Sequence, residues 1–248
     1  GALAIGLGTA ALLGWHPAKS QAQVSGNSIT VPARHARATP LSLNLPELPP
    51  AAENISPMVL TVTTRWEETG KSPRSLRQTV WRTRDRVRIA LEGAESEWLF
   101  LRNPVDPRRV TASLIDHRTK RILGYDETDL RNGQGVRGWL DVLTLRVDTR
   151  ALKSLRDTGR RETVAGIEFV EHVRDAASGS GDGIVDLWWS ASHLLPLRFS
   201  VREGRVLAIS AVQIGPAAIE DNALAAASER FPRYTVLDIA DAREGRSH

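Results

Sequence analysis

From residue 58 onward, apolar and polar residues alternate along the chain with a period of two. The first such segment, MVLTVTTRW, puts Leu60, Val62 and Trp66 on one side and Thr61 and Arg65 on the other. Successive side chains of a strand point to opposite faces, so this alternation is typical of a strand with one buried face. The pattern therefore predicts a β-strand over residues 58–66.

The next run, LRQTVWRTRDRVRIAL, continues the alternation as one segment over residues 76–91. It places Trp81, Val87 and Ile89 on one side, and on the other side a row of four arginines: Arg82, Arg84, Arg86 and Arg88. We interpret this row as a solvated strand face that discourages pairing between sheet edges. Contact with phosphate or carboxylate groups is the alternative.

Similar runs predict further strands, whereas the middle of the chain changes period. Apolar residues between 126 and 157 follow helical spacing, which predicts one short amphipathic helix at residues 139–145 and a second at 151–155. An alanine-rich stretch predicts another at 221–228. The remaining strands are expected at 97–102, 109–116, 121–125, 162–165, 167–174, 184–191, 194–203, 206–214 and 234–239.

The connections between these strands are short, which favours antiparallel neighbours. We therefore expect an α+β fold that is mainly β. It would be a strongly curved antiparallel sheet, an open half-barrel, with short helices covering its apolar concave face. Two packed sheets or a closed barrel remain as alternatives.

The first 57 residues have a different character. Ala2 to Trp15 form an apolar run of 14 residues, and Ser20-Gln21-Ala22 follows with the small residues of a cleavage site. A membrane-spanning helix needs about 20 apolar residues, so residues 1–22 resemble an export signal without its basic start. The alternative is an uncleaved membrane anchor. We expect a proline-rich disordered tether at 23–57, a single domain at 58–240 and a tail at 241–248.

Composition narrows the possible function classes. The chain has no cysteine, which excludes disulfides, a lipidated cysteine anchor and thiolate zinc sites. Its formal net charge is +4. In an exported, periplasmic protein this charge favours peripheral contact with an anionic membrane surface over nucleic acid.

Candidate catalytic groups are few. Asp116-His117 and Glu171-His172 are adjacent pairs, and neighbours in a strand project to opposite sides. The segment Ser190-Ala191-Ser192-His193 lacks a nucleophile elbow. A hydrolase using His193 or His172 is therefore the least favoured hypothesis, and we expect neither a metal nor a cofactor.

Large apolar residues on the predicted strands and helices are the stronger candidates for a functional site, because indole and aliphatic side chains suit the lining of an apolar ligand cavity. Ordinary core packing explains the same residues. The predicted cavity is lined by Leu60, Val62, Trp66, Trp81, Val87, Ile89, Trp98, Phe100, Leu114, Trp139, Leu143, Trp188, Leu195, Leu197 and Phe199.

Three short motifs carry a family resemblance. They are RDRVRI at 84–89, SLIDHRTKRILGY at 113–125, and LWWS at 187–190 with the later LPLR at 195–198. Over residues 58–215 their order resembles the LolA/LolB/RseB-like superfamily of lipoprotein-sorting and lipid-sensing proteins. The resemblance implies an open half-barrel that accepts acyl chains under a helical lid. It also implies a strand arginine that holds the lid or contacts a headgroup, here Arg86 or Arg88, although the arginine row faces away from the apolar side.

Together these patterns favour a non-enzymatic periplasmic binding protein that accommodates a lipid, acyl chain or lipoprotein in an apolar concavity. The alternative is an envelope sensor or scaffold that binds a protein partner through a sheet edge or the tether.

Overall fold

The structure is a computed structural model that describes residues 45, 47–175, 181–215, 219–220 and 222–244. The predicted export signal, most of the predicted tether and the last four residues lie outside these residues. No helix of the described part is long and apolar enough to cross a membrane.

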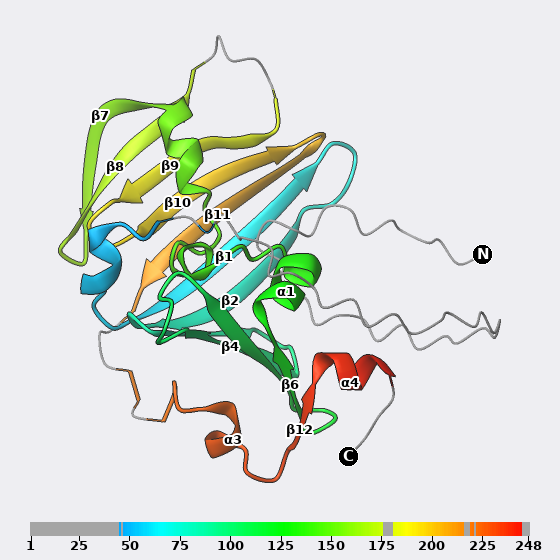
Figure 1. The fold of residues 1–248 in the computed structure, drawn as a ribbon. Coiled ribbons are helices and arrows are strands. Elements are labelled where there is room, and N and C mark those ends of the chain that lie inside the picture. The colour runs from blue at the N-terminus through cyan, green and yellow to red at the C-terminus, as the bar shows by residue number, and fades with distance from the viewer. Residues whose placement is uncertain (1–44, 46, 176–180, 216–218, 221, 245–248) are drawn as a thin grey trace, which may run out of the picture.

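Twelve strands form one strongly curved, open sheet (Figure 1). Its order is β12-β6-β5-β4-β3-β2-β1-β11-β10-β9-β8-β7, and every neighbouring pair is antiparallel except β12 and β6. The predicted open half-barrel is confirmed. The strands are β1 (Met58–Glu68), β2 (Arg74–Arg82), β3 (Arg86–Leu91), β4 (Ser96–Arg102), β5 (Val110–Asp116), β6 (Arg121–Tyr125), β7 (Leu155–Val164), β8 (Ile167–Arg174), β9 (Gly183–Ser190), β10 (Leu195–Glu203), β11 (Val206–Ile214) and β12 (Thr235–Asp238).

The run over residues 76–91 is two strands rather than one. β2 ends at Arg82 and β3 begins at Arg86, and the amide of Thr83 donates to the carbonyl of Arg86 across 2.8 Å. Cross-strand partners share a face, and Arg82 pairs with Val87 while Trp81 pairs with Arg88. The turn therefore separates the predicted arginine row between the two faces of the sheet.

The concave, inner face of the sheet is covered by residues 127–154, which we call the lid segment. It contains α1 (Glu127–Asp129), the π-helical turn η2 (Leu130–Gln134), α2 (Trp139–Leu143) and the 3-10 helix η3 (Thr149–Ser154). The sheet and the lid share one buried apolar cluster that includes Leu60, Phe100 and Leu143. The predicted covering helices are thus present, although none is longer than six residues.

The outer face is covered in part by the C-terminal segment. Leu99, Ile115 and Ile122 alternate with the inner-face residues and pack against Leu224 and Ala227. This segment contains α3 (Ala227–Arg230) and ends in α4 (Ile239–Glu244). The helix predicted at 221–228 is therefore only four residues long and begins at Ala227, near the end of the predicted range.

The last part of the predicted tether is packed on the domain. Residues Pro50–Asn54 form the 3-10 helix η1, and Ala52 and Ile55 are buried in the main core. Glu53 forms an ion pair with Arg102 of β4. This part was predicted to be disordered from its proline content. It is ordered because burying the apolar side chains of Ala52 and Ile55 stabilises it against the domain. The domain therefore begins before residue 58.

Candidate functional site

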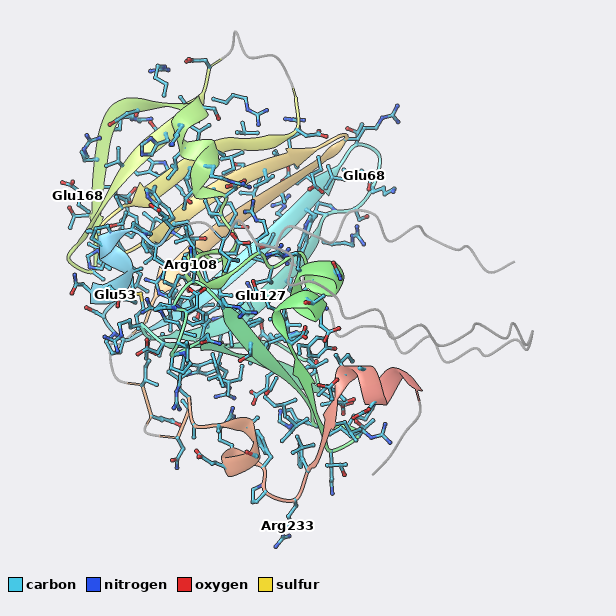
Figure 2. The ribbon with its side chains drawn as sticks, viewed as in Figure 1. Glu53, Glu68, Arg108, Glu127, Glu168 and Arg233 are labelled. Atoms are coloured by element: carbon cyan, nitrogen blue, oxygen red, sulfur yellow. The ribbon has the colours of Figure 1, made fainter. Side chains whose placement is uncertain are left out.

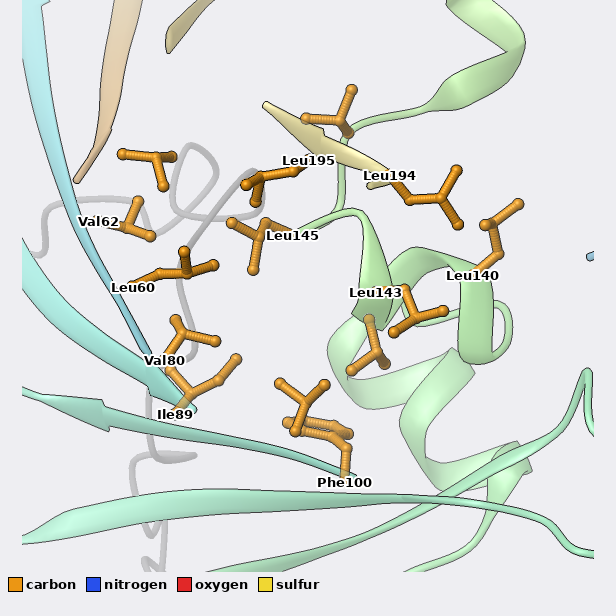
Figure 3. Close-up of a cluster of buried hydrophobic side chains, with 14 of the residues drawn as sticks. Leu60, Val62, Val80, Ile89, Phe100, Leu140, Leu143, Leu145, Leu194 and Leu195 are labelled. Atoms are coloured by element: carbon orange, nitrogen blue, oxygen red, sulfur yellow. The ribbon is translucent and has the colours of Figure 1, made fainter. Parts of the chain in front are cut away.

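The interface between the lid segment and the inner face is the candidate site. Figure 3 shows Leu140, Leu143 and Leu145 of the lid segment opposite Leu60 and Ile89 of the sheet. Leu194 and Leu195, at the hairpin between β9 and β10, close the same cluster. The surface that the lid segment covers is therefore almost entirely apolar.

Thirteen of the fifteen predicted lining residues belong to this cluster, and each is at most 8% exposed. They are Leu60, Val62, Val87, Ile89, Trp98, Phe100, Leu114, Trp139, Leu143, Trp188, Leu195, Leu197 and Phe199. Their burial is shown, whereas their contact with a ligand stays a prediction.

Two of the predicted lining residues lie elsewhere. Trp81 is on the outer face, where the guanidinium of Arg88 lies 4.2 Å from the centre of its ring. Trp66 is half-buried and is not part of the main cluster. Trp81 was predicted on the same face as Val87 and Ile89. The turn after β2 puts it on the opposite face, where it pairs with Arg88.

In this arrangement the lid segment itself fills the hollow of the sheet. Two surface pockets of the described part of the chain lie away from this interface, one over β2 and β3 beside Arg77 and the other on the lid segment's own surface beside Arg150. Close packing leaves little unfilled volume between well-matched apolar surfaces. A guest on the inner face therefore requires the lid segment to move.

A buried arginine joins the lid to the sheet. Arg82, the last residue of β2, is 0% exposed. Its guanidinium donates to the carbonyl oxygens of Leu143 (2.7 Å), His193 (2.7 Å) and Leu194 (3.0 Å), and its Nη2 lies 3.4 Å from the sulfur of Met58. One side chain thus ties the end of α2, the β9–β10 hairpin and two strands together.

The acceptors of Arg82 are dipoles rather than carboxylates. Leu143 is the last residue of α2, and the carbonyls at a helix C-terminus lack partners within the helix. Burial lowers the pKa of Arg82 to about 10, so the group stays charged at neutral pH. A buried cation whose oxygen acceptors are all backbone carbonyls is stabilised only while those carbonyls stay in place.

Arg86 and Arg88, the arginines expected at the lid, lie on the outer face. Arg86 donates to the carbonyl of Leu224 across 2.7 Å, and Arg88 pairs with the buried carboxylate of Glu97. Glu97 also binds Arg230 of α3 at 2.8 Å. These arginines therefore hold the C-terminal segment, and Arg82 contacts the lid instead.

Sequence reasoning missed Arg82 because it treated residues 76–91 as one strand. The available signal was the polar stretch Thr83-Arg84-Asp85, whose residues favour a turn. A turn there places Arg82 beside Val80 on the apolar side.

A second lid contact depends on a close backbone approach. A Cβ added to Gly138 would lie 2.7 Å from the carbonyl oxygen of Arg108, in the loop between β4 and β5. The next residue, Trp139, is fully buried and donates from its indole Nε1 to the carbonyl of Arg84 across 3.0 Å. The start of α2 is therefore fixed against two loops of the sheet.

The hydroxyl–imidazole cluster lacks the third member of a hydrolytic triad. His193 Nδ1 lies 2.9 Å from Ser192 Oγ and 3.4 Å from Ser190 Oγ, and its hydrogen bonds in the described structure involve no carboxylate. Asp116 instead caps the turn after β5, and Glu171 accepts from Thr158. Within the described residues no three histidine or acidic side chains gather as metal ligands.

We predict that His193 makes stability depend on pH. Burial, and then the charge of Arg82, lower the pKa of His193. The unfolded chain, with an imidazole pKa of about 6.5, binds this proton more readily than the folded chain. Stability contributed by His193 is therefore present above that value and is lost as pH falls through it. Urea unfolding at pH 7 and pH 5 should show a smaller loss for His193→Gln than for the parent chain, and equal losses would contradict this assignment.

No protein-family model matches the chain, and no curated protein matches it significantly. Solved structures with similar folds include PNGF-II, with 12% identity, a TM-score of 0.38 and coverage of 75% of this chain and 32% of that one. They also include MucB, with 19% identity, a TM-score of 0.36 and coverage of 71% and 60%. A LolA superfamily protein from Nitrosomonas europaea matches with 11% identity, a TM-score of 0.27 and coverage of 71% and 94%. The superfamily that the sequence resembles is thus represented among the similar structures.

Proposed function

We propose that this chain is a non-enzymatic binding protein of the bacterial envelope, located in the periplasm. It takes up an acyl chain, from a lipid or a lipoprotein, on the inner face of its sheet. The lid segment occupies that surface until a guest displaces it. Arg82 is a buried polar contact that helps to hold the lid segment closed.

The observation that carries this proposal is the pairing of a largely apolar inner face with a covering segment made of very short helices. Helices this short have little stability of their own, so they depend on the sheet for their structure. An acyl chain contacts the same kind of surface as Leu140, Leu143 and Leu145, and so competes with them for it. When the lid segment opens, the carbonyls that Arg82 binds become exposed to water, and hydrogen bonds to water replace those they lose.

Competition with the lid segment makes affinity depend steeply on chain length. Each methylene buried contributes about 0.8 kcal/mol, which corresponds to roughly a fourfold change in the dissociation constant. Short acyl chains cannot offset the lost contacts of the lid segment, whereas long ones can. We therefore expect displacement of a fluorescent fatty acid by C16 and C14 chains and none by C8.

The decisive experiment is native mass spectrometry of the chain purified from a bacterial periplasm, combined with that displacement series. Co-purifying lipid and a chain-length dependence would support acyl binding. If no lipid co-purifies and no chain of any length binds, the proposal is wrong.

The second candidate function is an envelope sensor or scaffold that binds a protein partner, and the sheet edge favours it. The sheet ends at β7, which pairs with β8 on one side and has no strand on the other in the described part of the chain. An added strand from a partner would satisfy the outer backbone groups of β7. A photo-crosslinker at the exposed Arg160 should then give one defined protein adduct in the periplasm, and its absence would exclude binding at this edge.

A further inference from the structure

The lid segment carries a surface pocket that the acyl-chain proposal does not use. Its volume is about 340 Å³, and all of its lining residues belong to the lid segment. They come from three parts, namely η2, α2 with the turn before it, and the start of η3. The lining residues are Arg131, Arg137, Leu140, Asp141, Asp148, Thr149 and Arg150.

Three guanidinium groups and two carboxylates meet in this pocket, and the carboxylates are already engaged. Asp141 accepts from both Nε (3.0 Å) and Nη2 (3.1 Å) of Arg137. Asp148 accepts from Nε and Nη2 of Arg150, each at 3.1 Å. The pocket therefore retains a surplus positive charge after internal pairing.

Several donors remain available at the pocket. Arg131 is half-buried; its Nε has no acceptor among the described residues but is itself buried, so Arg131 would meet a guest through its terminal nitrogens. The Nη2 of Arg131 makes only long contacts, 3.4 Å to the carbonyl of Arg137 and 3.6 Å to Glu127. Arg150, whose side chain is 67% exposed, uses Nε and Nη2 of its guanidinium on Asp148, which leaves its Nη1 for a further acceptor.

We propose that this pocket binds a phosphate-type oxyanion, which bridges η2, α2 and η3. Arginine forks suit phosphate oxygens, and each such hydrogen bond is charge-assisted. The volume is about ten times the share of one water molecule in the liquid, so a phosphate bearing further atoms also fits. The same chemistry is offered by a free phosphate ion and by the headgroup of an anionic lipid.

The oxyanion site is separate from the apolar inner face. A bound phosphate would cross-link the parts of the lid segment to one another, and Leu140 is the one sheet-facing leucine that also lines the pocket. It should therefore stabilise the lid segment without filling the inner face. Acyl uptake measured in phosphate-free buffer then tests the proposed function by itself, and phosphate binding measured without fatty acid tests the oxyanion site by itself.

Calorimetric titration of the full chain at low ionic strength tests the proposal with three probes: inorganic phosphate, dihexanoyl phosphatidic acid below its micellar concentration, and dihexanoyl phosphatidylcholine. Arg150→Gln should weaken binding about tenfold, because it removes one charge-assisted contact. Asp148→Asn should strengthen binding, because it removes a negative charge yet can still cap η3. Arg233→Gln is the matched control, because Arg233 lies exposed beyond α3, far from the lid segment in Figure 2.

Binding of inorganic phosphate that follows this order of variants supports a site for free oxyanions. Binding of phosphatidic acid alone, in the same order, supports a site for lipid headgroups. The proposal is overturned if neither probe binds, if phosphatidylcholine binds as tightly as phosphatidic acid, or if Arg150→Gln behaves like Arg233→Gln. Uptake of a fluorescent fatty acid by Arg150→Gln checks independently that the variant is folded.

Discussion

Replacement of Arg82 by methionine should cost about 2 to 3 kcal/mol of unfolding free energy and should loosen the lid segment more than the sheet. The substitution leaves the carbonyls of Leu143, His193 and Leu194 buried without their donor. Relief from burying a cation offsets part of this loss, but the unpaired carbonyls remain. We therefore expect a net destabilisation together with easier opening.

Hydrogen exchange distinguishes local opening from general loss of stability. The amides of Thr144, Arg146 and Val147 are hydrogen-bonded within the lid segment and report its opening. In Arg82→Met they should exchange at least about tenfold faster, whereas strand amides of β1 should change only with global stability. Acyl binding should tighten in the same variant, because the open form is more populated.

Two controls sharpen the Arg82 result. Arg77→Met changes an exposed arginine on the same strand but on the opposite face, and it should leave lid exchange unchanged. Arg82→Lys keeps a charge but cannot reach three carbonyls in a fork, so it should fall between the parent and Arg82→Met. If Arg82→Met leaves lid exchange at the parental rate, Arg82 does not hold the lid.

Replacement of Trp139 by alanine should have the largest effect on stability, about 4 kcal/mol. Trp139 is 0% exposed, and its removal leaves a cavity between α2 and the sheet as well as an unpaired carbonyl on Arg84. Trp139→Phe keeps most of the apolar contact and loses the indole hydrogen bond, so it should cost about 1 kcal/mol.

Urea unfolding of both variants measures these differences. The large gap between alanine and phenylalanine is expected because packing, rather than the single hydrogen bond, anchors the start of α2. A cost below about 1 kcal/mol for Trp139→Ala would show that the lid segment is not anchored there. Fatty-acid binding by Trp139→Phe then checks whether the inner face remains functional.

Much of the fold was predictable because a period-two pattern is a local property of the chain. β1, β6, β8 and β11 lie within two residues of the predicted strands, and the change of period marked the lid segment. The helices predicted at 139–145 and 221–228 are shorter in the structure, because packing against the sheet, rather than helix propensity, determines how much of each segment is helical.

The candidate site was predictable only in its apolar part. Thirteen of the fifteen predicted lining residues share one core, since hydrophobic residues on an alternating strand face are buried whatever covers them. The polar contact was misassigned, because Arg82 and Arg88 differ only in which side of one turn they occupy. Adding or removing one residue in the turn moves every later side chain to the opposite face of the sheet.

The sequence by itself determined a succession of antiparallel strands, their apolar face and the position of the helical segment, because each follows from the spacing of apolar residues along the chain. Only the tertiary structure decided that Arg82 is the buried arginine at the lid, that Arg86 and Arg88 hold the C-terminal segment, and that three guanidiniums of the lid segment surround one pocket. These outcomes depend on which distant residues meet after folding. The sequence does not show whether a charged side chain will face water or a buried carbonyl. The free energy of each arrangement depends on the neighbours that folding brings to that side chain.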